Sequence, residues 1–224
     1  MIINHGSHVH DISKESSRDT VDYFGKFSKY SKGIYSGHGE EGIIEELLNY
    51  IGQEKLNKWC CEFGAWDGKH FSNTFALVEK GWNAVYIESD KKKFDLLLKT
   101  ANEHSSIIAI NKTVHYIKEK GELLDEILSQ TIIPYDFDIL SIDVDGPDYH
   151  IWKSLKNYKP KIVVIEHSGN MEDYIIYRDG AIHKKDGNGS TSFLPMKELG
   201  EEKGYSLIVD TGNLIFLDEK FIGK

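Results

Sequence analysis

The sequence has few cysteines, few arginines and no long apolar run, and each scarcity excludes a class of protein. Its two cysteines, Cys60 and Cys61, are adjacent in an apolar run, where successive strand side chains point to opposite faces and cannot easily pair. This excludes a disulfide scaffold and favours a reducing compartment. Only Arg18 and Arg178 are arginines, so few positions can hold a phosphate or carboxylate through two parallel hydrogen bonds.

No apolar run approaches the roughly 18 residues of a membrane span, and no charged-then-apolar leader opens the chain. We therefore expect a cytoplasmic protein without membrane insertion. The formal net charge of −9 repels a phosphate backbone, so we expect a small-molecule partner rather than nucleic acid. Assembly into homo-oligomers stays open.

The composition, with 40% hydrophobic and 28% charged residues among 224, is typical of one soluble domain. Residues 1–36 lack clear periodicity, so we expect an N-terminal arm there and a single domain over residues 37–224. His5, His8 and His10 lie in that arm. Without a cysteine or carboxylate framework beside them, they favour a polar terminus over a metal site.

Apolar periodicity predicts helices and strands in alternation. The predicted helices are 40–50, 72–80, 91–103, 122–128, 149–155 and 196–203, and the predicted strands are 59–63, 83–88, 107–111, 138–143, 161–166, 205–209 and 214–217. Such alternation requires a parallel sheet with helices on both faces. The last two strands flank a hairpin turn at 210–213. We therefore expect an α/β, Rossmann-like sheet of seven strands, mostly parallel, with a C-terminal antiparallel hairpin.

The first predicted strand runs into a glycine turn with Gly64 and Gly68, and the next strand ends at Glu88. Such a turn brings backbone N–H groups close to a ligand, and an acid about 20 residues on can accept both hydroxyls of a ribose. The competing role of Glu88, capping the next helix, suits Asp90 better. The turn lacks the third glycine of a dinucleotide site and the lysine of a triphosphate site. A cofactor without a pyrophosphate, such as S-adenosylmethionine, fits these features.

Ligands of an open parallel sheet bind beyond the carboxyl ends of its strands, so polar residues there are the candidates. In chain order they are Glu62, Gly64, Trp66, Asp67, Gly68, Glu88, Asn111, Asp143, Asp145, His150, Glu166 and His167. Methyl transfer from a sulfonium needs an aligned acceptor and a group that takes its proton. Asp143, Asp145 and His167 are the candidates for this catalytic role.

Asp143, Asp145 and Glu166, with His167, could instead hold Mg²⁺ or Ca²⁺, which prefer oxygen ligands. We do not favour a metal, because Asp145–Gly146 could equally form a turn, with Asp148 capping the next helix.

The long segment from His167 to Thr191 has the length of a lid or binding loop. Arg178 could grip an anionic substrate, while Tyr174 and Tyr177 could stack on a sugar. We expect the acceptor site between this segment and the end of the fourth strand, with His150, Glu166, Tyr177 and Arg178 as its ligands. The alternative is a surface hairpin around Arg178.

Four stretches, at 62–68, 86–88, 138–146 and 164–166, resemble the successive motifs of FkbM-type S-adenosylmethionine-dependent methyltransferases. The resemblance covers about residues 37–218. It implies a class I fold and an O-methyltransferase that acts on an activated sugar, glycoconjugate or surface-polysaccharide precursor.

The resemblance also implies roles for single residues. Gly64, Ala65 and Gly68 would approach the methionine part, Glu88 the ribose and Asn111 the adenine, with Asp143 beside the methyl group. Trp66–Asp67 and His167 depart from the pattern of many members, which leaves the acceptor open. Two alternatives also stay open: an NAD(P)-dependent sugar oxidoreductase or epimerase, and a non-catalytic partner subunit.

Overall fold

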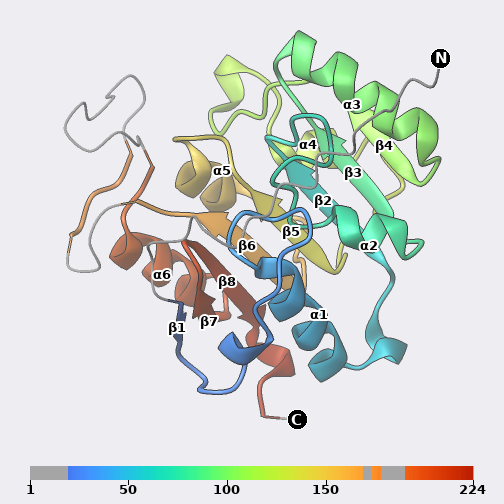
Figure 1. Ribbon diagram of the computed structural model, residues 1–224. Coiled ribbons are helices and arrows are strands. Elements are labelled where there is room, and N and C mark those ends of the chain that lie inside the picture. The colour runs from blue at the N-terminus through green and yellow to red at the C-terminus, as the bar shows by residue number, and fades with distance from the viewer. Residues whose placement is uncertain (1–19, 169–172, 178–189, 224) are drawn as a thin grey trace, which may run out of the picture.

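The computed structural model describes residues 20–168, 173–177 and 190–223. Its strands form one sheet in the order β1-β7-β8-β6-β5-β2-β3-β4 (Figure 1). They are β1 (Val21–Asp22), β2 (Trp59–Phe63), β3 (Asn83–Ile87), β4 (Ile107–Ile110), β5 (Ile139–Ile142), β6 (Ile162–Glu166), β7 (Tyr205–Asp210) and β8 (Asn213–Asp218). β2 to β6 pair in parallel, whereas β8 is antiparallel to β6 and β7. The predicted fold class is confirmed, including the terminal hairpin.

The predicted number of seven strands was wrong by one. The additional strand, β1, has two residues and pairs antiparallel with β7 at the edge of the sheet. A strand this short has no room for an alternating pattern, so periodicity could not find it. Phe27, shortly after β1, is buried in the core with Ile43 and Ile44 of the first long helix.

Helices cover both faces of the sheet, as predicted. They are α1 (Glu40–Ile51), α2 (Phe75–Glu79), α3 (Lys91–Glu103), α4 (Leu124–Leu128), α5 (Asp148–Ser154) and α6 (Phe193–Glu202). α1, α2 and α3 pack on one face and α4, α5 and α6 on the other, each over its own apolar core. Cys60 and Cys61 are free, fully buried and divided between the two cores, as their adjacency in a strand predicted.

Polar side chains set where two helices begin. Asp90 caps α3, as predicted, by accepting hydrogen bonds from the N–H groups of Lys92 and Lys93 at 2.8 and 2.9 Å. α2 begins three residues later than predicted. Ser72 precedes this helix and accepts hydrogen bonds from Thr74 N–H and Phe75 N–H. The polar residues before α2, Ser72 to Thr74, are therefore buried.

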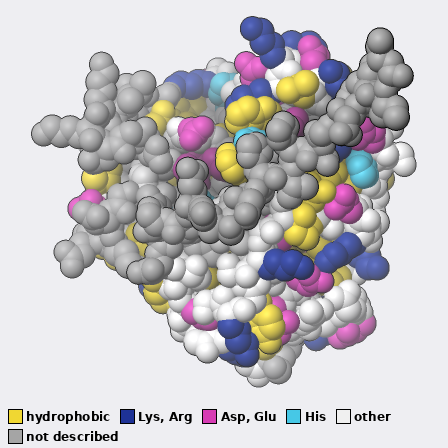
Figure 2. All heavy atoms as spheres, viewed as in Figure 1, with side chains coloured by type: hydrophobic (Ala, Val, Ile, Leu, Met, Phe, Trp, Pro, Cys, Tyr) yellow, Lys and Arg dark blue, Asp and Glu magenta, His cyan; other side chains and the backbone are white. Residues whose placement is uncertain are grey.

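No helix in the described part of the chain is both long and apolar enough to span a membrane. In the space-filling view, basic and acidic side chains are mixed over the visible face and do not gather into one positive patch (Figure 2).

Candidate active site

The order of the sheet reverses between β2 and β5, from which the chain continues outward to β3 and β4 on one side and to β6 on the other. Ligands of such sheets bind at this point, beyond the carboxyl ends of the strands, here called the carboxyl edge. Gly64 lies directly at the reversal. A Cβ atom there would be 1.7 Å from the carbonyl oxygen of Asp143, and its φ is +76°. Only glycine allows this approach of the β2 loop to the end of β5.

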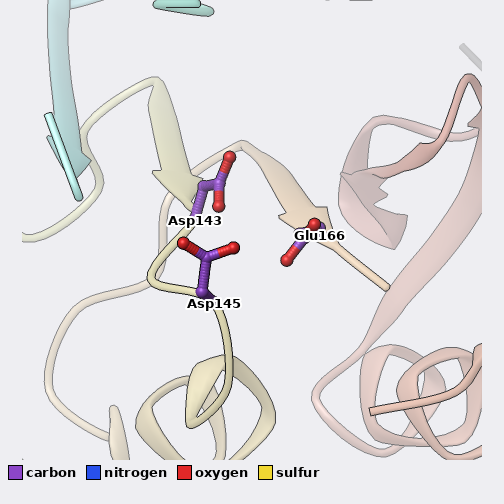
Figure 3. Close-up of side chains that lie close together, drawn as sticks. All are labelled: Asp143, Asp145 and Glu166. Carbon is purple, nitrogen blue, oxygen red and sulfur yellow. The ribbon is translucent and has the colours of Figure 1, made fainter. Parts of the chain in front are cut away.

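Three carboxylates converge at the same edge. Asp143 and Asp145 follow β5 and Glu166 ends β6, and one oxygen of each lies within 4.8 Å of the others. Figure 3 shows the three side chains turned toward one another. The parallel pairing of β5 with β6 brings these distant parts of the chain together, as the sequence predicted.

Burial and neighbouring negative charges change the acidity of Asp143. The pKa of Asp143 is raised from 3.8 to about 7, first by burial and then by the carboxylates of Asp148, Asp145 and Glu40. The ammonium of Lys93 acts in the opposite sense. Asp143 is nonetheless exposed to solvent at the carboxyl edge. Asp143 can therefore exchange a proton near neutral pH.

Glu166 behaves in the same way. Burial, followed by the charge of Asp143, raises the pKa of Glu166 to about 7, although a hydrogen bond from the Ser190 hydroxyl opposes the change. Asp143 and Glu166 thus titrate in the same pH range, and the ionisation of one carboxyl group disfavours the ionisation of the other.

Asp148 closes the turn that carries Asp145. Its buried carboxylate accepts hydrogen bonds from Val144 N–H at 2.9 Å and Gly146 N–H at 2.8 Å. The suggested helix cap was therefore wrong, because Asp148 is the first residue of α5 and binds the turn before it. This turn does not remove Asp145 from the cluster. Asp145 has a φ of +56°, and its carboxylate faces Asp143 and Glu166.

Glu88 fastens the glycine loop to the end of β3. The side chain is 5% exposed, and its two oxygens accept hydrogen bonds from Trp66 N–H at 2.9 Å and Asp90 N–H at 2.7 Å. Each carboxylate oxygen has a second lone pair that can accept a hydroxyl. Asn111 donates to the backbone oxygens of Glu88 and Ser89, which fixes the same corner.

The remaining predicted cofactor residues support or line the loop. Glu62 is buried and accepts hydrogen bonds from Ser72 and Thr74, and burial raises its pKa to about 7. It joins the end of β2 to the start of α2. Ala65 is buried, whereas the Trp66 indole is 39% exposed.

Gly68 has a φ of +82° and packs against Leu97 and Tyr86. It therefore fixes the path of the glycine loop, since a side chain there would meet Leu97 at 2.8 Å.

Two of the predicted acceptor residues lie beside the carboxylates. A Cβ atom on Gly146 would be 3.0 Å from the Tyr177 ring, so this ring packs against the turn that bears Asp145. The backbone oxygen of Tyr177 lies 2.8 Å from His150 Nε2, and the His150 ring stacks on Tyr116. Tyr177 and His150 thus form one wall next to the cluster.

Tyr174, a further residue of the expected lid, does not join this wall. Tyr174 donates its hydroxyl hydrogen to Glu198 of α6, away from the carboxylates. Arg178 lies outside the described residues, as does most of the segment expected to form a lid.

The structure does not bring His167 into the carboxylate cluster. Glu166 and His167 are consecutive at the end of a strand, so their side chains point to opposite faces. His167 is 4% exposed, packs against Phe193 of α6 and places Nε2 3.1 Å from an Asp210 carboxylate oxygen. Among the described residues, its Nδ1 has no hydrogen-bond partner. The proximity of His167 to Glu166 in sequence was misleading.

Sequence reasoning missed Glu40. This fully buried carboxylate at the start of α1 accepts hydrogen bonds from Thr211 and Asn213 of the β7–β8 hairpin and from His38 N–H, each at 2.9 Å. Asn213 lies opposite Glu166 in the sheet, so Glu40 fixes the back of the cluster. Two acids at a helix start, flanked by Gly39 and a further glycine, were the signal available in the sequence.

Comparisons with known proteins agree with this architecture. The chain is similar in structure to the CurJ carbon methyltransferase (9% identity, TM-score 0.50, covering 80% of this chain and 52% of that one). It is also similar to magnesium protoporphyrin IX methyltransferase (ChlM) from Synechocystis PCC 6803 with bound SAH (9% identity, TM-score 0.49, covering 79% of this chain and 82% of that one). A third similar structure is the N-terminal domain of EvdMO1 with SAH bound (10% identity, TM-score 0.49, covering 80% of this chain and 80% of that one).

At 9% identity, the likeness to the CurJ structure shows the fold alone. No curated protein gives a significant match in sequence. The family model of the Methyltransferase FkbM domain matches residues 69–207, which is more than half of the chain. The chain therefore belongs to the FkbM methyltransferase family.

Proposed function

We propose that this protein transfers a methyl group from S-adenosylmethionine to a hydroxyl of an activated sugar, glycoconjugate or surface-polysaccharide precursor. The observation that carries the proposal is the carboxylate cluster at the carboxyl edge. A carboxyl group with a pKa of about 7, as in Asp143 and Glu166, can accept a hydroxyl proton near neutral pH. Membership of a methyltransferase family supports this chemistry over that of a nicotinamide-dependent sugar enzyme or a non-catalytic subunit.

The chemistry of the β2 and β3 ends fits the cofactor. Bound S-adenosylmethionine supplies a methyl group on a sulfonium. The Glu88 oxygens can accept two ribose hydroxyls while they keep the bonds to Trp66 and Asp90. We assign the cofactor to Glu62, Gly64, Ala65, Trp66, Gly68, Glu88, Asn111 and Asp143.

The acceptor belongs beside Asp143. We propose that Asp143 takes the proton of the reacting hydroxyl, and that Asp145 and Glu166 accept hydrogen bonds from further hydroxyls. The Tyr177 ring next to this cluster can pack on the apolar face of a sugar. His150 holds Tyr177 in place, and we keep Arg178 as a proposed acceptor ligand. His167 is placed to fix the end of β6 through Asp210 rather than to meet the acceptor.

Cofactor binding is tested by calorimetry. We expect S-adenosylmethionine and S-adenosylhomocysteine to bind with micromolar affinity, and Glu88→Ala to weaken both by more than tenfold. The reason is that hydrogen bonds to a charged group contribute about 1.5–3 kcal/mol each. Glu54→Ala, in an exposed turn, is the control and should bind normally. A folded wild-type protein that bound neither compound would refute the proposal.

Removal of metal ions tests the role of the carboxylates. Asp143, Asp145 and Glu166 also have the spacing and the oxygen donors for a divalent cation. We expect methyl transfer to continue unchanged in EDTA, because a proton acceptor needs no cation. Loss of activity in EDTA that Mg²⁺ restores would instead assign the cluster to a metal.

A further inference from the structure

The carboxyl edge of the sheet is acidic, yet the proposed cofactor brings an anion to it. S-adenosylmethionine has a cationic sulfonium, a cationic amino group and an anionic carboxylate. The carboxylates of Asp143, Asp145 and Glu166 favour the two cations and repel the anion. A cation at this edge would offset that repulsion and favour binding of the whole methionine part.

Lys93 is a cation that the described structure places there without an ionic partner. It is the third residue of α3, its side chain is half-buried, and its ammonium lies 4.1 Å from the centre of the Trp66 indole ring. Nearby lysines are engaged elsewhere, Lys69 with Glu103 and Lys91 with Asp95. Within the described residues, Lys93 forms no ion pair with a carboxylate.

The position of Lys93 relates it to both ends of the proposed cofactor site. Trp66, on which its ammonium lies, belongs to the glycine loop and donates its N–H to Glu88. In the other direction, the charge of Lys93 lowers the pKa of Asp143. The ammonium therefore lies on the glycine loop, next to the proposed ribose site, and its charge acts on the carboxylate at the reacting side.

The backbone of Trp66 adopts a conformation that presents the indole to Lys93. Its φ is +48°, in the left-handed region that bulky residues rarely adopt. A contact between an ammonium and an exposed aromatic ring is weak, whereas a charge-assisted hydrogen bond to a carboxylate is stronger. Lys93 thus makes a weak contact with Trp66 and can exchange part of it for a contact with an anionic ligand.

We propose that Lys93, seated on Trp66, binds the carboxylate of the cofactor's methionine part. This assignment rests on the proposed function. The indole holds the side chain in place, so little conformational freedom is lost when the carboxylate arrives. The site then distinguishes S-adenosylmethionine from adenosyl compounds that lack the carboxylate.

Calorimetry with two cofactors tests the assignment. S-adenosylmethionine and decarboxylated S-adenosylmethionine differ only in the carboxylate. We expect Lys93→Met to raise the Kd for S-adenosylmethionine about tenfold and to leave the Kd for the decarboxylated compound unchanged. Lys93→Arg, which keeps the charge, should recover most of the affinity. Lys92→Met, one position away on α3 and exposed, should change neither Kd.

Each contrary result has a separate meaning. Equal weakening of both compounds by Lys93→Met would show that Lys93 acts only by supporting the Trp66 loop, and would overturn the assignment. An unchanged Kd for S-adenosylmethionine would overturn it as well. A wild-type protein that binds neither compound would refute the proposed function itself, before any variant is compared.

Discussion

The Asp143→Asn variant is expected to lose methyl transfer by a factor of about 10² to 10⁴, because an amide cannot accept the proton of the attacking hydroxyl. Asn has nearly the same size, and the Gly64 contact involves the backbone oxygen of residue 143. The loop should therefore keep its shape, and saturating S-adenosylmethionine compensates for any cofactor affinity lost with the charge. Single-turnover rates with bound cofactor measure the chemical step directly.

The pH dependence of the wild-type rate provides an independent check. Burial and neighbouring acids raise the pKa of Asp143 to about 7, so below this pH the protonated carboxyl cannot act as a base. The rate should rise with pH through this range and then level off. The apparent pKa belongs to the coupled pair of Asp143 and Glu166.

The Asp143→Asn variant should lose the rise in rate with pH. Asp95→Asn, on the exposed face of α3, should keep it. A wild-type rate in Asp143→Asn would exclude Asp143 as the base.

The Lys161→Met variant is expected to lower the free energy of unfolding by about 3–5 kcal/mol, because it leaves a buried carboxylate without its cation. Lys161 Nζ lies 2.8 Å from Asp138 Oδ1, and the two side chains are 3% and 0% exposed. They lie where β5 and β6 begin, at the opposite end of the sheet from the proposed site. The same carboxylate accepts hydrogen bonds from Asn57 N–H and Trp59 N–H. It therefore connects the starts of β5 and β6 with the segment that leads into β2.

Urea denaturation followed by circular dichroism measures this loss, and a surface pair provides the matched control. Lys80 and Glu45 are also 2.8 Å apart but about half exposed, so Lys80→Met should cost no more than about 1 kcal/mol. Adding Asp138→Asn to Lys161→Met removes the unpaired charge and should recover part of the loss. An equal loss of unfolding free energy in Lys161→Met and Lys80→Met would show that burial adds nothing to the contribution of the Lys161–Asp138 pair.

Many local features of the fold were predictable because each depends on a few neighbouring residues. The apolar runs at Cys60 and Cys61, and at the next strands, predicted a sheet buried on both faces. Asp90 capped α3 as predicted, because a cap needs only a side chain and the next N–H groups. The turn at 210–213 predicted the β7–β8 hairpin for the same reason.

Boundaries and side-chain directions were less predictable. α2 begins at Phe75 because Ser72 and Thr74 bind Glu62, a residue on another element. β1 forms because β7 offers it an edge. His167 was expected beside Glu166, yet its side chain lies on the other face and binds Asp210.

The sequence by itself determined the alternation of elements, the glycine turn after β2 and the acids at the strand ends. Periodicity, turn chemistry and strand-end position are local properties of the chain, and the FkbM motifs follow the same order. The sequence placed the acids of β5 and β6 on neighbouring strands, and only the tertiary structure decided that β5 also pairs with β2 and how close the three carboxylates come. That strand order brings one oxygen each of Asp143, Asp145 and Glu166 within 4.8 Å of one another, in a place where burial, followed by the charges of Asp148 and Asp145, raises the pKa of Asp143. It depends on packing between segments far apart in sequence, which no local pattern records.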